Sequence, residues 1–372
     1  MRIAVAYSSK KGLQKEYRKH LEEFLFDQEE EPPPSDFFAE GDSECTINAV
    51  MEAFRSKGHT VCGVEADDEA PVNLARSRPD MVFNIAEGLF GDFRESYIPM
   101  VCERLGLPYS GSGPLTLAVC LNKERTKEIL SYHSIPNARF MTVSPNEKIN
   151  LDGFKFPAII KPVAEGSSKG IFDDSVVDDA RTAKKRIVEK IRKYRQPVIV
   201  EEFLDGREFT VAAWGNGTGF EVLPIISISY DELPSNARKI YSYEAKWVWD
   251  TPEKPLDIFK CPADLTSKEK KLIEDTVRKT CAVLGVKDLC RVDIRFDSKG
   301  VPNVLELNPL PGILPNPDDN SCFPKAARTA GYNYPDMLDN IIRIAAKRWG
   351  IGKESENRRT GERAAKKSRK SK

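Results

Sequence analysis

The sequence predicts a mixed α/β protein in which a parallel α/β domain comes first and two α+β segments follow. Short β-rich runs at residues 2–7, 60–65 and 81–85 are separated by a helical stretch at about 45–57 and a polar link. This alternation is typical of a parallel sheet. Strand-like runs outnumber helices after residue 156, which favours α+β segments there. With 372 residues the chain is too long for one small core, so we expect two or three domains.

The middle segment begins after residues 107–114, whose Pro, Gly and Ser residues predict a strand end and a turn. A helical pattern then covers about 115–132. Strands are predicted at 156–161 and 198–203, with a charged helix at about 178–194 between them. The middle segment therefore combines two strands with a connecting helix.

The last segment is predicted to contain four strands and one clear helix. The helix covers about 266–284, because apolar residues repeat at helical spacing and Thr266 and Glu269 fit a capping box at its start. Gly285 is suited to end this helix. The strands are predicted at residues 208–214, 222–228, 291–296 and 303–308.

Charge is unevenly distributed along a chain whose net charge is zero. Residues 21–44 contain ten acidic residues and no Lys or Arg, whereas residues 347–372 contain eleven basic and three acidic residues. Both stretches are expected to be solvated or disordered. The basic stretch could contact nucleic acid or anionic lipid, but no aromatic residue interleaves the charges after Trp349, which disfavours this alternative.

Cysteine and histidine usage disfavours zinc sites and histidine-based triads. The eight cysteines form no CxxC pair and mostly lie in apolar runs, so buried reduced thiols and a cytoplasmic location are expected. The three histidines have no convincing partners. The amino terminus enters a strand at once, unlike a signal peptide, and no apolar run approaches the roughly 18 residues that span a bilayer. We therefore expect no membrane association.

A small-residue loop follows the strand that ends near Lys161. Residues 165–170 contain two glycines and two serines, which allows backbone N–H groups to approach an anion closely. The spacing differs from that of a P-loop, and a Gly/Ser loop alone is more often an ordinary turn. The loop becomes a phosphate-site hypothesis only together with the lysine and the later segments.

A predicted hairpin near the end of the chain carries oxygen ligands on one face. Alternation along 291–296 separates Asp293 from the apolar residues. The turn at 297–300 begins with Asp and ends with Gly, and Glu306 and Asn308 share one face of the returning strand. Such oxygen ligands suit Mg²⁺ that bridges nucleotide phosphates. The alternative that stays open is a merely solvated sheet face.

The order of these motifs resembles that of the ATP-grasp ligases, and within them the D-alanine–D-alanine ligases. The resemblance covers roughly residues 45–345 and is collinear, which makes chance a poor explanation. The matching stretches are residues 106–113, 122–123, 161–168, 201–208, 243–246, 291–293, 306–308, 311–312 and 321–328.

The resemblance implies an ATP-grasp fold with an N-terminal parallel α/β domain and two α+β subdomains that clasp ATP. The implied divisions are an N-terminal domain at 1–118 with an acidic insertion at about 21–44, a central subdomain at 119–205, a C-terminal subdomain at 206–349 and a basic tail at 350–372.

The same resemblance implies roles for individual residues. The implied ATP-binding residues are Lys123, Lys161, Glu165, Ser167, Ser168, Glu201, Phe203, Leu204, Glu208 and Lys246. The implied ligands of two Mg²⁺ ions, with Mn²⁺ as a substitute, are Asp293, Glu306 and Asn308. The implied catalytic residues are Arg291, Gly312, Ser167 and Lys246. In the implied reaction a carboxylate attacks the γ-phosphate of ATP, and an amine then displaces phosphate from the acyl phosphate.

The substrate half departs from the family pattern. Glu87 stands where the family usually has histidine, and Arg94 adds a cation. Trp247 follows the lid lysine and supplies no aromatic hydroxyl. The N-terminal glutamate that would hold the first substrate's ammonium has no clean counterpart, although Glu40 and Glu44 are candidates. The residues assigned to the substrate site are Glu87, Arg94, Trp247, Ser321 and Cys322.

The favoured function is an ATP- and Mg²⁺-dependent carboxylate–amine ligase for amino acids or small peptides. The alternatives are an ATP-grasp kinase or carboxylating enzyme and a non-catalytic nucleotide-binding module. The expected partners are small-molecule substrates and a second copy of the chain in a homodimer. Nucleic acid and membrane are not expected.

Overall fold

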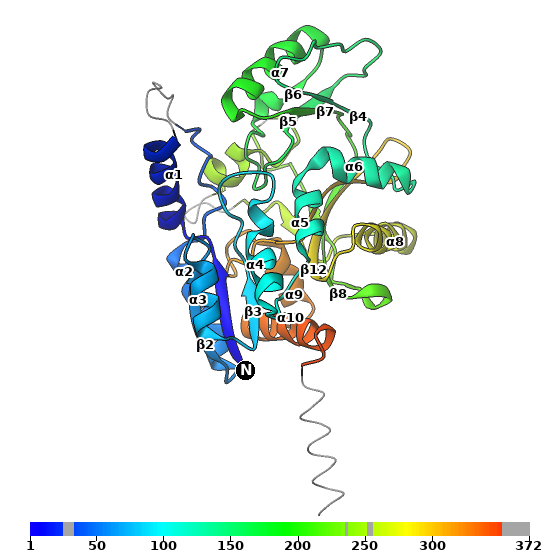
Figure 1. Ribbon diagram of the computed structural model, residues 1–372. Coiled ribbons are helices and arrows are strands. Elements are labelled where there is room, and N and C mark those ends of the chain that lie inside the picture. Colours follow the sequence, from blue (N-terminus) through cyan, green and yellow to red (C-terminus); the bar gives the residue numbers. More distant parts are fainter. Residues whose placement is uncertain (25–32, 235–236, 251–255, 352–372) are drawn as a thin grey trace, which may run out of the picture.

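The computed structural model describes residues 1–24, 33–234, 237–250 and 256–351, apart from the side chain of Trp247 (Figure 1). Three β-sheets follow one another along the described chain. In Figure 1 the first sheet lies at the lower left, the second at the top beside α7, and the third in the centre. Most of the predicted basic tail, residues 352–372, lies outside the described residues.

The first sheet is parallel, as the alternation of strands and helices predicts, and has the order β2-β1-β3. Its side chains share a core with the last two helices: Ile3 and Val5 lie in the same apolar cluster as Phe323 and Leu338. The C-terminal helices therefore pack on the first sheet rather than only on the nearest segment in sequence. The elements of this part are β1 (Arg2–Tyr7), α1 (Lys10–Phe24), α2 (Glu44–Ser56), β2 (Thr60–Glu65), α3 (Ala70–Ser77), β3 (Met81–Asn84), η1 (Arg94–Ser96), α4 (Tyr97–Leu105), α9 (Cys322–Thr329) and α10 (Tyr334–Arg348).

The second sheet is antiparallel and has the order β4-β7-β5-β6. Helix α7 begins at the predicted charged stretch, and the side chain of Asp179 caps it by accepting from Thr182 N. Its Ala183 and Ile187 join the apolar core of this sheet. The elements are α5 (Pro114–Leu121), α6 (Lys123–Tyr132), β4 (Phe140–Val143), β5 (Ala158–Pro162), η2 (Asp173–Ser175), β6 (Val176–Val177), α7 (Ala180–Tyr194) and β7 (Val198–Glu202).

The third sheet has six strands, in the order β11-β10-β8-β12-β13 with β9 paired to β8. Helix α8 covers it through Ile273 and Val277, and the predicted capping box of Thr266 and Glu269 is confirmed. The elements are β8 (Glu208–Gly215), η3 (Gly217–Gly219), β9 (Glu221–Val222), β10 (Ile226–Ile228), η4 (Ala245–Trp249), β11 (Phe259–Lys260), α8 (Ser267–Val283), β12 (Asp288–Phe296) and β13 (Pro302–Asn308).

Two predicted elements are divided in the structure. The helix expected at 115–132 is two helices, because Asn122 is extended and its side chain caps α6. The strand expected at 222–228 is two short strands, β9 and β10, on either side of Pro224. Proline has no N–H to donate to a sheet ladder, which explains this division.

A buried carboxylate at the start of β12 connects distant parts of the chain. Asp288 is fully buried and its Oδ2 accepts from Gly111 N at 2.9 Å and from Arg348 Nη2 at 2.6 Å. Arg348 Nη2 also donates to Tyr109 O at 2.8 Å. The loop that ends the first segment, the third sheet and α10 thus meet at one carboxylate.

Two expectations from composition can be compared with the structure. All eight cysteines are free; four are buried, but Cys45 and Cys62 are exposed, so the prediction of burial is wrong for these two. Among the residues that the structure describes, no helix has the length and apolar content needed to cross a membrane.

Candidate active site

A cavity of about 690 Å³ lies where the three sheets meet. Its wall is built from the phosphate loop, the β12–β13 hairpin, the end of β7, and residues 35–46 of the first segment. The wall includes every predicted site residue except Glu165, Arg94 and Trp247. Sequence motifs that are up to about 200 residues apart therefore line a common space.

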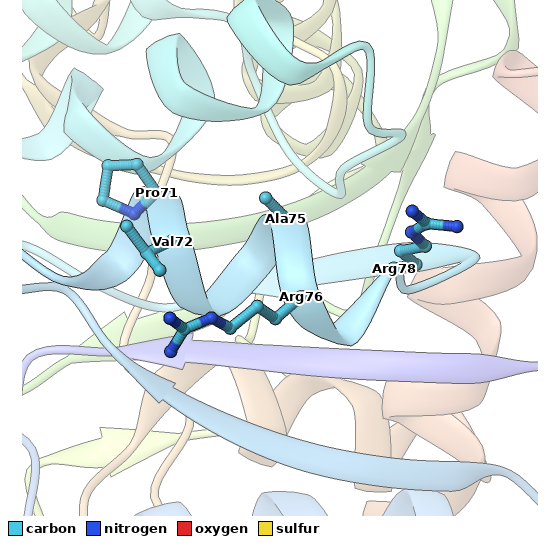
Figure 2. Close-up of a pocket in the computed structure, with 5 residues that line it drawn as sticks. All are labelled: Pro71, Val72, Ala75, Arg76 and Arg78. Carbon is cyan, nitrogen blue, oxygen red and sulfur yellow. The ribbon is translucent and has the colours of Figure 1, made fainter.

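A hollow along α3 has a different character (Figure 2). Its lining residues are Pro71, Val72, Ala75, Arg76 and Arg78. In the close-up the guanidinium groups of Arg76 and Arg78 lie at opposite sides of the view and do not converge on one point. No carboxylate lines this hollow, so the catalytic chemistry is sought in the larger cavity.

The predicted β12–β13 hairpin pairing is confirmed. Asp293 lies opposite Glu306, and Arg291 lies opposite Asn308. Arg291 donates to both carboxylate oxygens of Asp293 at 2.9 and 3.0 Å, and Thr210 Oγ1 donates to Asp293 at 2.7 Å. The carboxylate of Asp293 is therefore held in a fixed orientation facing the cavity.

The donor set on this hairpin fits a hard cation. Lys123 Nζ lies 3.0 Å from Glu306 Oε1, and the buried Nδ2 of Asn308 has no hydrogen-bond partner. Within the described ranges, no group of three or more His, Cys, Asp or Glu residues is arranged to hold a metal. Two carboxylates and one carboxamide remain, which suits Mg²⁺ that completes its shell with nucleotide phosphates and water.

A buried group of two lysines and one glutamate lies behind the nucleotide side of the cavity. Glu201 is 1% exposed, and its carboxylate contacts Lys127 Nζ at 3.1 Å and Lys161 Nζ at 2.7 Å. Burial opposes the charged carboxylate, but the two lysines outweigh it and lower the pKa of Glu201. Glu201 therefore fixes Lys161 at the cavity wall, and the predicted contact with adenine falls to the neighbouring residues up to Leu204.

Glu208, the predicted ribose ligand, also has protein partners. Its carboxylate accepts from Tyr230 OH at 2.7 Å and from Arg295 Nη1 at 3.0 Å. Burial raises the pKa of Glu208 despite the opposing effect of Arg295. A sugar hydroxyl would have to share this carboxylate with both side chains.

The phosphate loop adopts backbone conformations that are uncommon for its residues. Ser167 and Ser168 have φ angles of 50° and 61°, in the left-handed region that non-glycine residues seldom occupy. Ser168 Oγ donates to Tyr241 O at 3.0 Å, and Lys123 Nζ donates to Glu165 O. These bonds tie the loop to the third segment and to α6.

The acidic stretch at 21–44 is not simply solvated, which corrects the expectation from composition. Glu40 is 7% exposed, and its carboxylate accepts from Gly166 N at 2.9 Å, from Arg94 at 3.1 Å and from Lys169 Nζ at 2.7 Å. Burial would raise the pKa of Glu40, but Arg94 and Lys169 hold it well below the ordinary range.

Asp36 makes the second contact between this stretch and the phosphate loop. Its Oδ2 accepts from Gly170 N at 2.7 Å and from Tyr194 OH at 2.8 Å. Two carboxylates from residues 36–40 thus hold both ends of the loop. Glu44, the other candidate of the sequence, is exposed and pairs with Lys11 at the surface.

The first segment also contributes carboxyl groups whose pKa values are raised. Burial is the largest cause for Asp42 and Glu95, whose pKa values rise to about 7. Burial and then repulsion from Glu40 and Glu95 raise the pKa of Glu87 well above its ordinary value. This wall of the cavity therefore holds weakly compensated carboxyl groups.

The remaining predicted residues lie on the opposite wall. Ser321 Oγ donates to Gly312 O at 3.1 Å and accepts from Leu314 N at 3.1 Å, which fixes the loop that presents Gly312. Burial raises the pKa of the Cys322 thiol to about 11, and burial together with Arg291 lowers the pKa of Lys246.

Comparison with known proteins identifies the family. The family model described as "D-ala D-ala ligase C-terminus" matches residues 129–343. The chain belongs to this family. The predicted resemblance to D-alanine–D-alanine ligases is therefore confirmed, and with it the prediction of an ATP-dependent ligase that forms C–N bonds.

Individual relatives agree with this assignment. The chain is 31% identical over 311 residues to the uncharacterized protein y4sG of Sinorhizobium fredii, covering 81% of this chain and 88% of the relative. It is 30% identical over 298 residues to the D-alanine–D-alanine ligase of Aquifex aeolicus, covering 80% and 93%. It is 29% identical over 303 residues to that of Actinobacillus succinogenes, covering 80% and 91%.

Solved structures support the fold. The D-alanine–D-alanine ligase from Bacillus anthracis complexed with ATP superposes with a TM-score of 0.67 at 22% identity, covering 93% of this chain and 98% of that one. The predicted ATP-grasp fold is confirmed. The domain boundaries at 118, 205 and 349 stay predictions, and the core that α10 shares with the first sheet argues against fully separate units.

Sequence reasoning within this ligase family missed several cavity residues. Lys127, Lys169 and Tyr241 were not assigned, and Glu40 was only one of two candidates. The unusual excess of aromatic and acidic residues at 35–44 was a signal for Glu40, because a solvated stretch rarely contains Phe37 and Phe38 in succession.

Proposed function

We propose that this family member is an ATP- and Mg²⁺-dependent ligase that joins the carboxylate of one amino acid or small peptide to the amine of another. The observation that carries the proposal is the meeting of the phosphate loop and the Asp293–Glu306 hairpin in one cavity. The first pair to test is D-alanine with D-alanine, because the curated relatives named above are D-alanine–D-alanine ligases.

Each wall of the cavity has a role in the proposed reaction. Lys123, Lys161 and Lys246 would neutralise charge on the transferring phosphoryl group. Asp293, Glu306 and Asn308 would hold divalent cations, in our proposal two Mg²⁺ ions. When bound, such cations bridge phosphate oxygens and stabilise their developing charge.

Arg291 and Gly312 would act in the second half of the reaction. The guanidinium of Arg291 is fixed by its two bonds to Asp293, so it is oriented before substrate binds. Together with the Gly312 N–H it would stabilise the oxyanion that forms when the amine attacks the acyl phosphate. Fixed donors of this kind need no reorganisation during the reaction, which is why they accelerate it.

The proposal is tested by a coupling screen. MgATP is combined with pairs of D- and L-amino acids, released phosphate is measured, and products are identified by mass. We expect phosphate release only with matching pairs, a product with the mass of an amide, and loss of activity with EDTA that Mg²⁺ or Mn²⁺ restores. Phosphorylated or carboxylated product without amide would contradict the proposal.

A variant locates the chemistry in the cavity. Asp293→Asn keeps the size of the side chain but removes a metal-binding charge, so phosphate release should be abolished while the thermal unfolding temperature changes little. Activity of this variant equal to the unchanged protein would exclude Asp293 as a ligand. A homodimer and a cytoplasmic location stay predictions.

A further inference from the structure

Two carboxyl groups, Asp42 and Glu87, are held side by side on the first-segment wall of the cavity; we call them the acidic pair. Ser8, at the end of β1 and 1% exposed, connects their loops. Ser8 O accepts from Asp42 N at 2.9 Å, and Ser8 Oγ accepts from Gly88 N at 3.0 Å. The acidic pair is therefore anchored to the first sheet rather than to a mobile surface loop.

The acidic pair lacks a cationic partner. Oδ2 of Asp42 is shielded from solvent and has no hydrogen-bond partner. Among the ion pairs of the described residues, none includes Asp42 or Glu87. A buried polar atom without a partner costs about 1–3 kcal/mol, so a ligand that supplies the missing donor would bind favourably here.

Nearby cations are already engaged. Arg94 and Lys169 both pair with Glu40 and with Glu165. Arg94 reaches Glu87 only as a weak opposing influence, and burial together with the repulsion from other carboxyls prevails. The charge that would balance the acidic pair has to come from a bound molecule.

The chemistry of the site favours an organic ammonium over a metal ion. Two carboxyls are too few for a protein-only Ca²⁺ site, which takes six to eight oxygen ligands. The triphosphate of ATP is excluded because it carries the same sign of charge. An amino acid with a neutral side chain offers one ammonium to two carboxyls, whereas a diamino acid offers two.

We propose that one amino-acid substrate of this ligase carries two ammonium groups, as a diamino acid does, and that Asp42 and Glu87 bind them. This inference rests on the proposed function, since it names the substrate class of the same cavity. It assigns specificity to residues 42 and 87 and leaves the ATP and metal side unchanged.

The first test measures binding and does not require turnover. Ornithine and lysine are compared by calorimetry with norvaline and norleucine, in D and L forms, with Mg²⁺ and a non-hydrolysable ATP analogue present. Charge-assisted hydrogen bonds predict that the diamino acid of the preferred hand binds about 10- to 100-fold more tightly than its neutral counterpart. Equal or weaker binding of every diamino acid overturns the inference.

Matched variants assign the preference to the acidic pair. Asp42→Asn and Glu87→Gln should each reduce the ratio of diamino to neutral affinity by about tenfold. Glu44→Gln removes an exposed carboxylate two residues from Asp42 and should leave the ratio unchanged. A ratio that both cavity variants retain overturns the assignment, and circular dichroism shows whether each variant is folded.

The two proposals fail in different ways. If neutral amino acids are coupled as well as diamino acids, the ligase proposal holds and the inference is wrong. If diamino acids bind selectively but no pair releases phosphate, the acidic pair is supported and the ligase proposal is wrong.

Discussion

Carboxyl groups in the cavity fall into two classes according to their partners. Glu40 and Glu201 lie against two cations each, and their pKa values are lowered although both are buried. Asp42 and Glu87 lack such partners, and their pKa values are raised. The first class therefore stabilises the folded cavity, whereas the second class is held at a cost to stability.

This difference predicts how stability changes with pH. Burial, opposed by a Ser8 backbone hydrogen bond and assisted by Glu65, raises the pKa of Asp42 from 3.8 to about 7. Between these values the folded state binds a proton that the unfolded state has lost, so the free energy of unfolding falls as pH rises. Asp42→Asn removes this dependence.

We therefore expect Asp42→Asn to be more stable than the unchanged protein, by a margin that grows by about 2 kcal/mol between roughly pH 5.5 and 8. Urea unfolding of both proteins at the two pH values measures the margin. A margin that is constant, or that shrinks with rising pH, would show that Asp42 titrates normally in the folded protein.

At the scale of elements, residues 33–42 act as part of the nucleotide site. Asp36 and Glu40 accept backbone hydrogen bonds from the two glycines of the phosphate loop. A side chain at Gly166 would place its Cβ 2.5 Å from Glu40 Oε1, so only glycine allows this approach. The segment and the loop are therefore fitted to each other.

Glu40→Gln should loosen this fit. The change leaves Arg94 and Lys169 with Glu165 as their remaining carboxylate, and breaking a buried ion pair costs about 3–5 kcal/mol. We expect lower stability to urea, faster hydrogen exchange at residues 165–170 and a raised KM for ATP. Glu44→Gln is the matched surface control; if both variants unfold alike and protect the loop equally, Glu40 has no such role.

The sequence was sufficient for elements whose pattern is local. The β12–β13 hairpin follows from alternation and from its turn residues, and α8 follows from its capping box. The contacts of Glu40 did not follow, because Gly166 and Lys169 are more than 120 residues away. Local composition predicted a solvated stretch, and tertiary packing overrode that prediction.

At the scale of the whole molecule, three segments meet around one cavity and are held together at distant points. Asp288 joins the loop at Gly111 to α10 through Arg348. The sequence predicted the three segments in order. It could not predict that α9 and α10 complete the core of the first sheet, because this packing joins the two ends of the described chain.

Asp288→Ala tests the importance of this junction. The change leaves Arg348 and the Gly111 N–H without their acceptor, so the free energy of unfolding should fall by about 3–5 kcal/mol. Asp80→Asn, which breaks the exposed pair between Arg2 and Asp80, should cost less than about 1 kcal/mol. Equal effects in chemical unfolding would show that the junction adds no stability.

The central claim, that this chain joins a carboxylate to an amine through an acyl phosphate, predicts the fate of one oxygen atom. A carboxylate oxygen attacks the γ-phosphorus, ADP leaves, and the amine then displaces phosphate together with that oxygen. With a donor labelled with oxygen-18 in its carboxylate, mass spectrometry should find one labelled oxygen in each released phosphate and an amide of matching mass. Unlabelled phosphate accompanying the amide would contradict the account.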